Sequence, residues 1–283
     1  MSLGLIYKNT AHIFDEVEKE TPYLEYPLFQ KTGIVTSAFS TRLGGVSEGY
    51  YSSLNLSFDR GDDPLKVLEN FKRIGASMGV KVEDMVLSKQ THTTNVRVVT
   101  AEDKGKGIVK ERNYTDVDGM ITNVPGICLV TSYADCVPLY FVDPVKKVIG
   151  LSHSGWRGTV GKIGKVTVEK MEEEFGCDPA DILGAVGPSI CQDCYEVSED
   201  VIEKFRENYD ENLWPEIFYQ KENGKYQLNL WKANESVFLE SGILPEHIAV
   251  TNVCTHCNPD ILFSHRTTGN ERGTLSAFLA LKK

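Results

Sequence analysis

Apolar runs of strand length, separated by turn residues, dominate the middle of the chain. Their hydrophobicity is nearly continuous rather than alternating, which is typical of strands that are covered on both faces. The four clearest runs occupy residues 119–122, 127–133, 138–142 and 148–153. Further strands are expected at residues 35–41, 85–87, 95–100, 248–253 and 261–264. The pattern therefore predicts a buried β-sheet.

Helical periodicity predicts four helices among these strands, at residues 64–78, 161–175, 198–208 and 230–241. Asp62 and Asp63 suit the start of the first helix, because carboxylates are favoured near a helix N-terminus. Gly176 follows the second helix in the position that glycine commonly takes after a C-terminus. Strands and helices alternate without a break in composition. We therefore predict one α/β domain over residues 1–283, with three α/β/α layers around a mixed sheet and residues 1–30 as a peripheral N-terminal segment.

Charge and hydropathy exclude two classes of partner. The chain has 40 acidic and 30 basic side chains, a formal net charge of -10, and no Lys/Arg block of five or more. An acidic chain without such a block repels the phosphate backbone of nucleic acid. No stretch reaches the ~18 uncharged apolar residues of a spanning helix, since Asp135 interrupts the best run. We expect neither nucleic acid nor a membrane as a partner.

The N-terminus lacks the apolar run of a signal peptide, so we expect the seven cysteines to be in a reducing compartment. We therefore expect a cytoplasmic protein whose cysteines act as thiols, metal ligands or catalytic groups. Two Cys-x-x-Cys pairs, Cys191 with Cys194 and Cys254 with Cys257, have a spacing common in zinc sites. Zinc ribbons separate such pairs by ~15–20 residues. The separation here is 59 residues, so we expect buried or redox-active thiols instead of a structural metal.

Three motifs place a metal-binding side chain near the end of an expected strand. They are Lys89-Gln90-Thr91-His92, Ala134-Asp135-Cys136 and Ser152-His153-Ser154-Gly155-Trp156-Arg157-Gly158. Loops at strand ends are where α/β folds place their sites. Two imidazoles and one thiolate form a ligand set that suits Zn²⁺ with a fourth position open. The motifs are far apart in the chain, so only the fold can bring His92, Cys136 and His153 together.

Other interpretations of these residues remain open on spacing alone. Cys136 could be a buried core thiol, with both histidines held by hydrogen bonds. Cys136 and His153 could instead form a nucleophile pair oriented by Asp135, as in a metal-independent Cys–His hydrolase. A zinc-stabilised binding module is a further alternative, which a fourth protein ligand would favour.

Arginines beside glycine turns predict an anion site. Arg42 follows an expected strand, Arg157 precedes a helix, and Arg266 lies near Arg272 after the last expected strand. Backbone N–H groups at a helix start add to the positive field around Arg157. We predict that these arginines bind substrate or phosphate, together with Gln90 of the first motif.

The chain resembles the YfiH / laccase-domain family of bacterial proteins from Phe39 to Leu281. The similarity is greatest where ADCVP is followed by HSGWRG, with His153 17 residues after Cys136, a highly specific combination. The other segments that carry it are FSTRLGGVSEGYYSSLNLSFDRGDD, KQTH, VDGMIT, YADCVPLYFVD, GLSHSGWRGTVGKI, GPSICQDCYEV and CTHCNPDILFSHR.

This resemblance implies a fold, a metal and a reaction. The fold is a three-layer α/β arrangement similar to that of bacterial toxin deamidases with a Cys–His site. The metal is zinc, held by His92, Cys136 and His153. The implied activity is phosphorolysis of adenosine, inosine and methylthioadenosine to free base and (methylthio)ribose-1-phosphate, with adenosine deamination. An older family label, polyphenol oxidase or laccase, implies copper instead.

The copper alternative is weakened by the histidine content. A multicopper centre uses many histidines in His-x-His pairs, whereas this chain has six histidines and no such pair. A single N2S site would still accept Cu²⁺. The chain departs from the family pattern twice just after the segment CTHCNPDILFSHR. Thr267 and Thr274 stand there in place of expected arginines.

The zinc interpretation assigns a role to each predicted residue. Zinc lowers the pKa of bound water, which suits deamination, although the cytidine-deaminase signature is absent. In phosphorolysis Arg42 and Arg157 would position phosphate against the ribose. His265 or Asp135 would act as the general acid that protonates the leaving purine.

Overall fold

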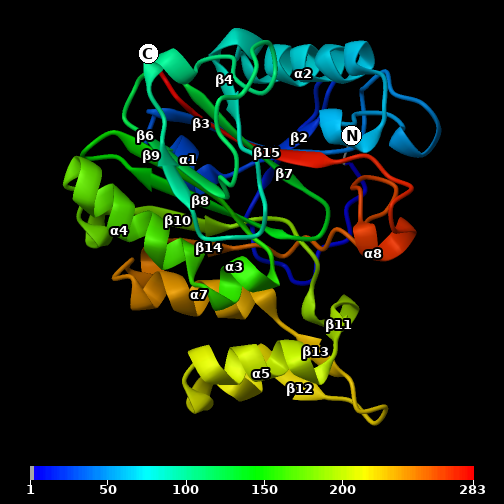
Figure 1. Cartoon of the computed structure of the whole chain (residues 1–283), viewed down its shortest axis with the longest axis vertical. Coiled ribbons are helices and arrows are strands. Elements are labelled where there is room, and N and C mark those ends of the chain that lie inside the picture. Colours follow the sequence, from blue (N-terminus) through cyan, green and yellow to red (C-terminus); the bar gives the residue numbers. More distant parts are fainter. Residues whose placement is uncertain (1–2) are drawn as a thin grey trace.

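The structure is a computed structural model that describes residues 3–283. Two six-stranded mixed sheets lie face to face at its centre (Figure 1). The first sheet contains β1 (Asp15–Val17), β2 (Tyr23–Glu25), β3 (Val35–Ser40), β4 (Met85–Leu87), β7 (Cys128–Tyr133) and β15 (Leu275–Leu281). The second contains β5 (Val96–Val98), β6 (Gly119–Thr122), β8 (Val137–Asp143), β9 (Val148–Ser154), β10 (Leu183–Val186) and β14 (Ile248–Val250). Their orders are β1-β2-β3-β15-β7-β4 and β14-β10-β8-β9-β6-β5.

Helices cover the outer face of each sheet. α2 (Pro64–Met78) packs on the first sheet, where its Phe71 shares an apolar cluster with Phe278 of β15. α4 (Ile163–Phe175) and α7 (Leu230–Glu240) pack on the second sheet, on the opposite side of the molecule in Figure 1. The α/β class with mixed sheets is confirmed. The layers of the described chain are nevertheless α/β/β/α, where the sequence predicted three layers and one sheet.

Double burial of the central strands explains this difference. Every residue of β8, β9 and β15 is buried. One face of each strand enters the apolar cluster between the sheets, and the other faces the helices. Continuous hydrophobicity predicts cover on both faces, but a helix and a second sheet bury the same kinds of apolar side chain. The pattern therefore could not identify the second sheet.

The four predicted helices are confirmed to within two residues at each end. Asp63 caps α2 by accepting a hydrogen bond from the Leu65 amide, and the helix ends at left-handed Gly79. Gly176 ends α4 in the same way. The remaining helices are α1 (Pro27–Gln30), α3 (Trp156–Val160), α5 (Glu199–Asn208), α6 (Trp214–Ile217) and α8 (His265–Thr268). None of the helices in the described part of the chain is long and apolar enough to cross a membrane.

The predicted strand at 261–264 is wrong. Those residues form a loop that leads into α8, and the Ser264 hydroxyl caps this helix by accepting from the Thr267 amide. Leu262 and Phe263 project from this loop into the core, where both are buried, and this burial accounts for the apolar run. The strand that completes the first sheet is β15, which the sequence analysis did not assign.

The N-terminal segment 1–30, expected to be peripheral, is part of the core over its described residues. β2 pairs with β3, and β1 extends the same sheet. Phe14 and Phe29 are 4% and 0% exposed. Met1 and Ser2 lie outside the described residues.

A small three-stranded sheet lies beyond α7 with α5, at the lower end of Figure 1. Its strands are β11 (Glu196–Val197), β12 (Phe218–Gln220) and β13 (Tyr226–Leu228). The residue just before β11, Tyr195, belongs to the pocket described next.

Candidate functional site

The fold brings His92, Cys136 and His153 together at one end of the two sheets. His92 lies in the loop between β4 and β5, Cys136 in the turn between β7 and β8, and His153 near the end of β9. His153 pairs with Pro138 across β8 and β9, so Cys136 lies just beyond the paired strands, close to Gly155. The potential ligand atoms of the three residues all lie within 4.8 Å of one another. The two imidazoles meet edge to face, with ring centroids 4.8 Å apart.

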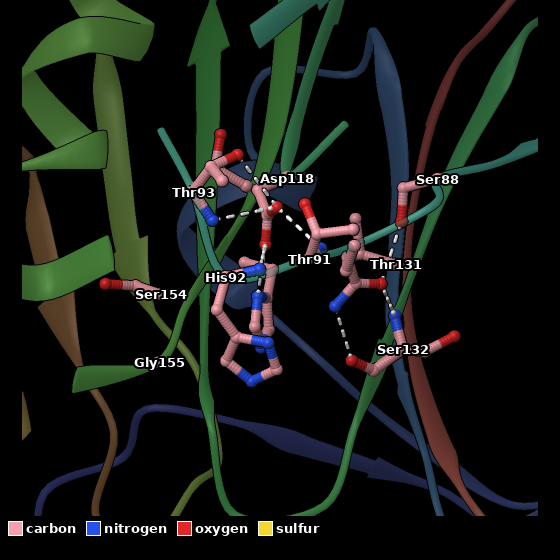
Figure 2. Close-up of polar contacts among 12 residues, drawn as sticks. Ser88, Thr91, His92, Thr93, Asp118, Thr131, Ser132, Ser154 and Gly155 are labelled. Atoms are coloured by element: carbon pink, nitrogen blue, oxygen red, sulfur yellow. Dashed lines mark hydrogen bonds and ion pairs between the residues drawn. The ribbon is translucent and has the colours of Figure 1, made fainter. Parts of the chain in front are cut away.

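Asp118 connects the two histidines, and Figure 2 shows it beside the loop of Thr91, His92 and Thr93. Its buried carboxylate accepts hydrogen bonds from the amides of Thr91, His92 and Thr93 at 2.9, 3.1 and 3.1 Å. The same carboxylate lies 2.8 Å from His153 Nδ1. A carboxylate there keeps the proton on Nδ1, so Nε2 is the ring nitrogen left for a metal.

The backbone around His92 has the shape that this arrangement needs. His92 adopts a left-handed φ of 66°, which turns three successive amides toward one carboxylate. Burial raises the pKa of Asp118, but hydrogen bonds from His153 and from the Thr91 and Thr93 amides outweigh burial and lower the pKa to about 2. Asp118 belongs to the VDGMIT motif, and no role was predicted for it from the sequence. The available signal in the sequence was that Asp118 directly precedes the strand expected at residues 119–122.

The charges of Cys136 and His153 support each other. Burial raises the pKa of the Cys136 thiol, while His153 and His92 lower it, with a net result of about 6. Burial lowers the pKa of His153, while Cys136 and Asp118 raise it, to about 9. The group thus provides a thiolate at neutral pH, which can ligate a metal or act as a nucleophile.

The donor set fits zinc. Zinc binds Cys sulfur and His nitrogen, and a carboxylate behind a ligating histidine is the usual supporting arrangement. Gly155 makes the convergence sterically feasible: a Cβ there would lie 2.9 Å from His92 Cδ2 and 3.3 Å from Cys136 Sγ. Cys136 and His92 both line a surface pocket, so a metal on these residues would be reached by a small molecule.

The pocket combines aromatic and basic side chains. Arg157 at the start of α3 lies 4.4 Å over the Trp156 ring, and Arg266 of α8 lies 5.3 Å over the Tyr195 ring. The pocket is lined by His92, Ala134, Asp135, Cys136, Gly155, Trp156, Arg157, Ile190, Tyr195, Leu230, His265 and Arg266. Of the predicted residues, the structure therefore brings Asp135, Arg157, His265 and Arg266 to the pocket that holds Cys136.

Asp135 and His265 differ in their freedom. Asp135 is 8% exposed and accepts hydrogen bonds from the Thr255 hydroxyl and the Arg266 amide, each at 2.6 Å. It thus fixes the turn that carries Cys136 to the loops beside it. His265 is exposed, and its Nδ1 lies 2.9 Å from the Gly269 carbonyl, which leaves Nε2 available at the pocket.

Arg42 and Gln90 do not line this pocket. The Arg42 guanidinium donates to the carbonyls of Ser52 and Pro259 and stacks on Phe263. Gln90 bonds the Ser132 backbone through both ends of its amide. Their placement gives no support to a substrate-binding role and explains them as links between loops.

Arg272 lies within the electrostatic reach of the site. Burial and the charge of Arg60 lower its pKa, which Asp135 and Cys136 oppose, with a net value of about 10. Its Nη1 donates to the Gly273 carbonyl. Three further pocket residues, Ile190, Tyr195 and Leu230, were given no role from the sequence, because none of them has a side chain typical of a metal ligand or a phosphate site.

The two Cys-x-x-Cys pairs also meet in the structure. The sulfur atoms of Cys191, Cys194, Cys254 and Cys257 all lie within 4.8 Å of one another. The 59 residues between the pairs form α5, the small three-stranded sheet, α7 and β14, and then return to the first pair. Distance along the chain was therefore a poor guide to distance in space, and the argument from spacing against a metal at these cysteines fails.

Known proteins resemble this chain over most of its length. A family model described as multi-copper polyphenol oxidoreductase laccase matches residues 36–282. The purine nucleoside phosphorylase YlmD of Bacillus subtilis (strain 168) is 34% identical over 97% of this chain and 99% of its own. The adenosine deaminase RL5, from an unknown prokaryotic organism, is 36% identical over 87% of this chain and 94% of its own.

Solved structures show the same likeness. The crystal structure of Bacillus licheniformis hypothetical protein YfiH superposes with a TM-score of 0.90 at 31% identity. The match covers 96% of this chain and 100% of that one. The YfiH-like fold predicted from the sequence is therefore confirmed.

Proposed function

This chain belongs to the laccase-like family whose model matches residues 36–282, and we propose that it is a zinc-dependent purine nucleoside phosphorylase. The observation that carries the proposal is the convergence of His92, Cys136 and His153 at a pocket with aromatic and arginine walls. The phosphorylase and deaminase names of its relatives support it. The proposed substrates are adenosine, inosine and methylthioadenosine, with deamination of adenosine as a second activity.

Zinc is the metal that we propose for His92, Cys136 and His153. When bound there, zinc supplies a Lewis acid toward an oxygen atom of the reactants. Copper would be accepted by the same ligands. A multicopper centre needs further histidines, and neither potential metal group in residues 3–283 contains more than two. We therefore place the polyphenol oxidase alternative second.

The walls of the pocket suit the parts of a nucleoside and of phosphate. Trp156 and Tyr195 offer aromatic contact to a purine beside Arg157 and Arg266, which stack on one face of each ring. Arg157 and Arg266 place two guanidinium groups at the same pocket. Each planar guanidinium group can bind two phosphate oxygens at once.

Phosphorolysis then needs two events, which these residues can organise. A phosphate oxygen forms a bond to ribose C1′ as the bond from C1′ to the purine nitrogen breaks. The purine keeps the electron pair and takes a proton. His265 Nε2 is the proposed proton donor, since it is exposed at the pocket edge whereas Asp135 is engaged by two hydrogen bonds.

The decisive experiment follows inosine in the presence of inorganic phosphate. Zinc-loaded enzyme is expected to release hypoxanthine and ribose-1-phosphate in equal amounts, and no product without phosphate. Cys136→Ala should lose this activity together with its metal. Cys177→Ala is the matched control, because Cys177 is a buried thiol outside the site. Turnover by Cys136→Ala equal to that of the wild type would contradict the proposal.

A metal-independent Cys–His hydrolase is the second candidate, favoured by the thiolate–imidazolium pair. With the Cys136 pKa at about 6, metal-free protein should be alkylated at Cys136 from about pH 6 upward. Reactivity rises with pH because only the thiolate attacks. The candidates separate on chelation: the hydrolase keeps its turnover and forms a covalent adduct at Cys136, whereas the zinc enzyme loses turnover and regains it with zinc.

We also propose that the protein works in the cytoplasm. All seven cysteines are free thiols in the structure, which suits a reducing compartment. Fractionation of the native cells, with immunodetection of the protein, tests this location.

A further inference from the structure

We propose that Cys191, Cys194, Cys254 and Cys257 form a second metal centre, a closed structural zinc site. This inference does not rest on the proposed function, because none of the four cysteines belongs to the pocket lining. Two Cys-x-x-Cys turns supply two sulfur atoms each, and all four atoms lie within 4.8 Å of one another. Four thiolates around one ion are the ligand set of structural zinc.

The backbone of the two turns is already paired. Ser189 and Cys254 form a parallel bridge, and the Thr255 amide donates to the Ser189 carbonyl. The Cys191 amide donates to Cys254 Sγ at 3.2 Å, and the sulfur atoms of Cys194 and Cys257 are 3.6 Å apart. Amide donors to ligating sulfur lower the cost of holding several thiolates together.

The surroundings separate this centre from the one at Cys136. Cys191 and Cys254 are 2% and 0% exposed, and both belong to a small apolar cluster with Ile190. Lys8 forms an ion pair with Asp193, between the cysteines of the first turn, which places a positive charge beside the cluster. Four protein ligands leave no position for a substrate, whereas the Cys136 group has three ligands at an open pocket.

The position of the centre gives it a purpose. The first turn continues into Ile190 and Tyr195, which line the pocket. The second carries Thr255, whose hydroxyl donates to Asp135 beside Cys136. The Ile190 amide donates to the Asp135 carbonyl. A metal that joins the two turns would therefore hold one wall of the pocket in place.

Zinc content per chain tests the proposal. Wild-type protein purified with reductant and zinc should contain two zinc ions, and Cys136→Ala should keep one. The double variant C194S/C257S should also keep one, while Cys177→Ala, a buried thiol outside both groups, should keep two. One zinc in the wild type that disappears in Cys136→Ala would overturn the second centre.

Cobalt spectroscopy covers the case in which the double variant fails to fold. Cobalt(II) in the Cys136→Ala protein should show the strong charge-transfer and ligand-field bands of tetrahedral four-thiolate coordination. Absence of these bands contradicts the proposal. So does mass spectrometry of protein purified with reductant if it finds a disulfide between the two turns.

Discussion

Asp118 controls both histidines of the site through one carboxylate. It fixes the His153 ring through Nδ1 and the His92 loop through three amides. In Asp118→Asn the amide carries no charge and accepts fewer hydrogen bonds. We expect metal affinity at Cys136 to fall about 10–100-fold, the usual effect of losing such a supporting carboxylate. Competition with a zinc chelator measures the loss.

Asp116→Asn is the matched control for this substitution. Asp116 lies in the same loop region and accepts hydrogen bonds from the Thr91 and Thr93 hydroxyls, but it does not touch His153. Its replacement should leave zinc affinity nearly unchanged. Equal losses in the two variants would mean that loop stability, and not the bond to His153, sets the affinity.

Residue identity was the most predictable part of the site. His92, Cys136 and His153 were recognisable through the motifs around them, because residue type and spacing alone also allowed a buried core thiol and hydrogen-bonded histidines. Asp118 was not assigned a role because a carboxylate that supports a ligand looks like any turn aspartate until its partners are known. Arg42 shows the converse, since its guanidinium satisfies backbone carbonyls that the sequence does not reveal.

At the scale of elements, α3 and α8 bring one arginine each to the pocket. Arg157→Ala and Arg266→Ala should each raise the KM for phosphate about 10–100-fold, since a hydrogen bond to a charged group contributes ~1.5–3 kcal/mol. Arg266→Ala keeps the backbone bond from its amide to Asp135, so the turn at Cys136 should persist. Steady-state kinetics with varied phosphate measure both constants.

Arg73→Ala provides the control for charge alone. Arg73 is on α2, where it pairs with Glu69 away from the pocket. Its removal should leave the KM for phosphate unchanged. An effect confined to kcat in the pocket variants would instead assign the two arginines to another step.

Strand and helix positions were predictable where local signals were strong. The caps Asp63 and Gly176 mark helix ends, and the run at β8 contains little but apolar residues. The loop at 261–264 was mistaken for a strand because burial, and not pairing, explains its apolar residues. Short apolar runs do not distinguish these causes.

At the scale of the molecule, the sequence could not show which elements meet. The face-to-face sheets and the joined Cys-x-x-Cys turns both depend on contacts between distant segments. A local pattern indicates whether a segment is buried, but it does not identify the other segment against which it packs. The same limit applies to the N-terminal segment, whose apolar residues are interspersed with charged ones and gave no sign that they enter the core between the sheets.

Phe29 tests whether that segment is integral to the fold. It is fully buried, and its ring lies 5.1 Å from Tyr26 and 6.2 Å from Tyr140 of the second sheet. Phe29→Ala should lower the free energy of unfolding by about 3–5 kcal/mol, because it leaves a cavity where segment and sheet meet. Ile6→Ala, which changes a side chain that is 60% exposed, should have little effect. Chemical denaturation measures both variants. Since the N-terminal segment and both sheets share one apolar cluster, the loss should shift a single unfolding transition, and equal stability of the two variants would return the segment to a peripheral role.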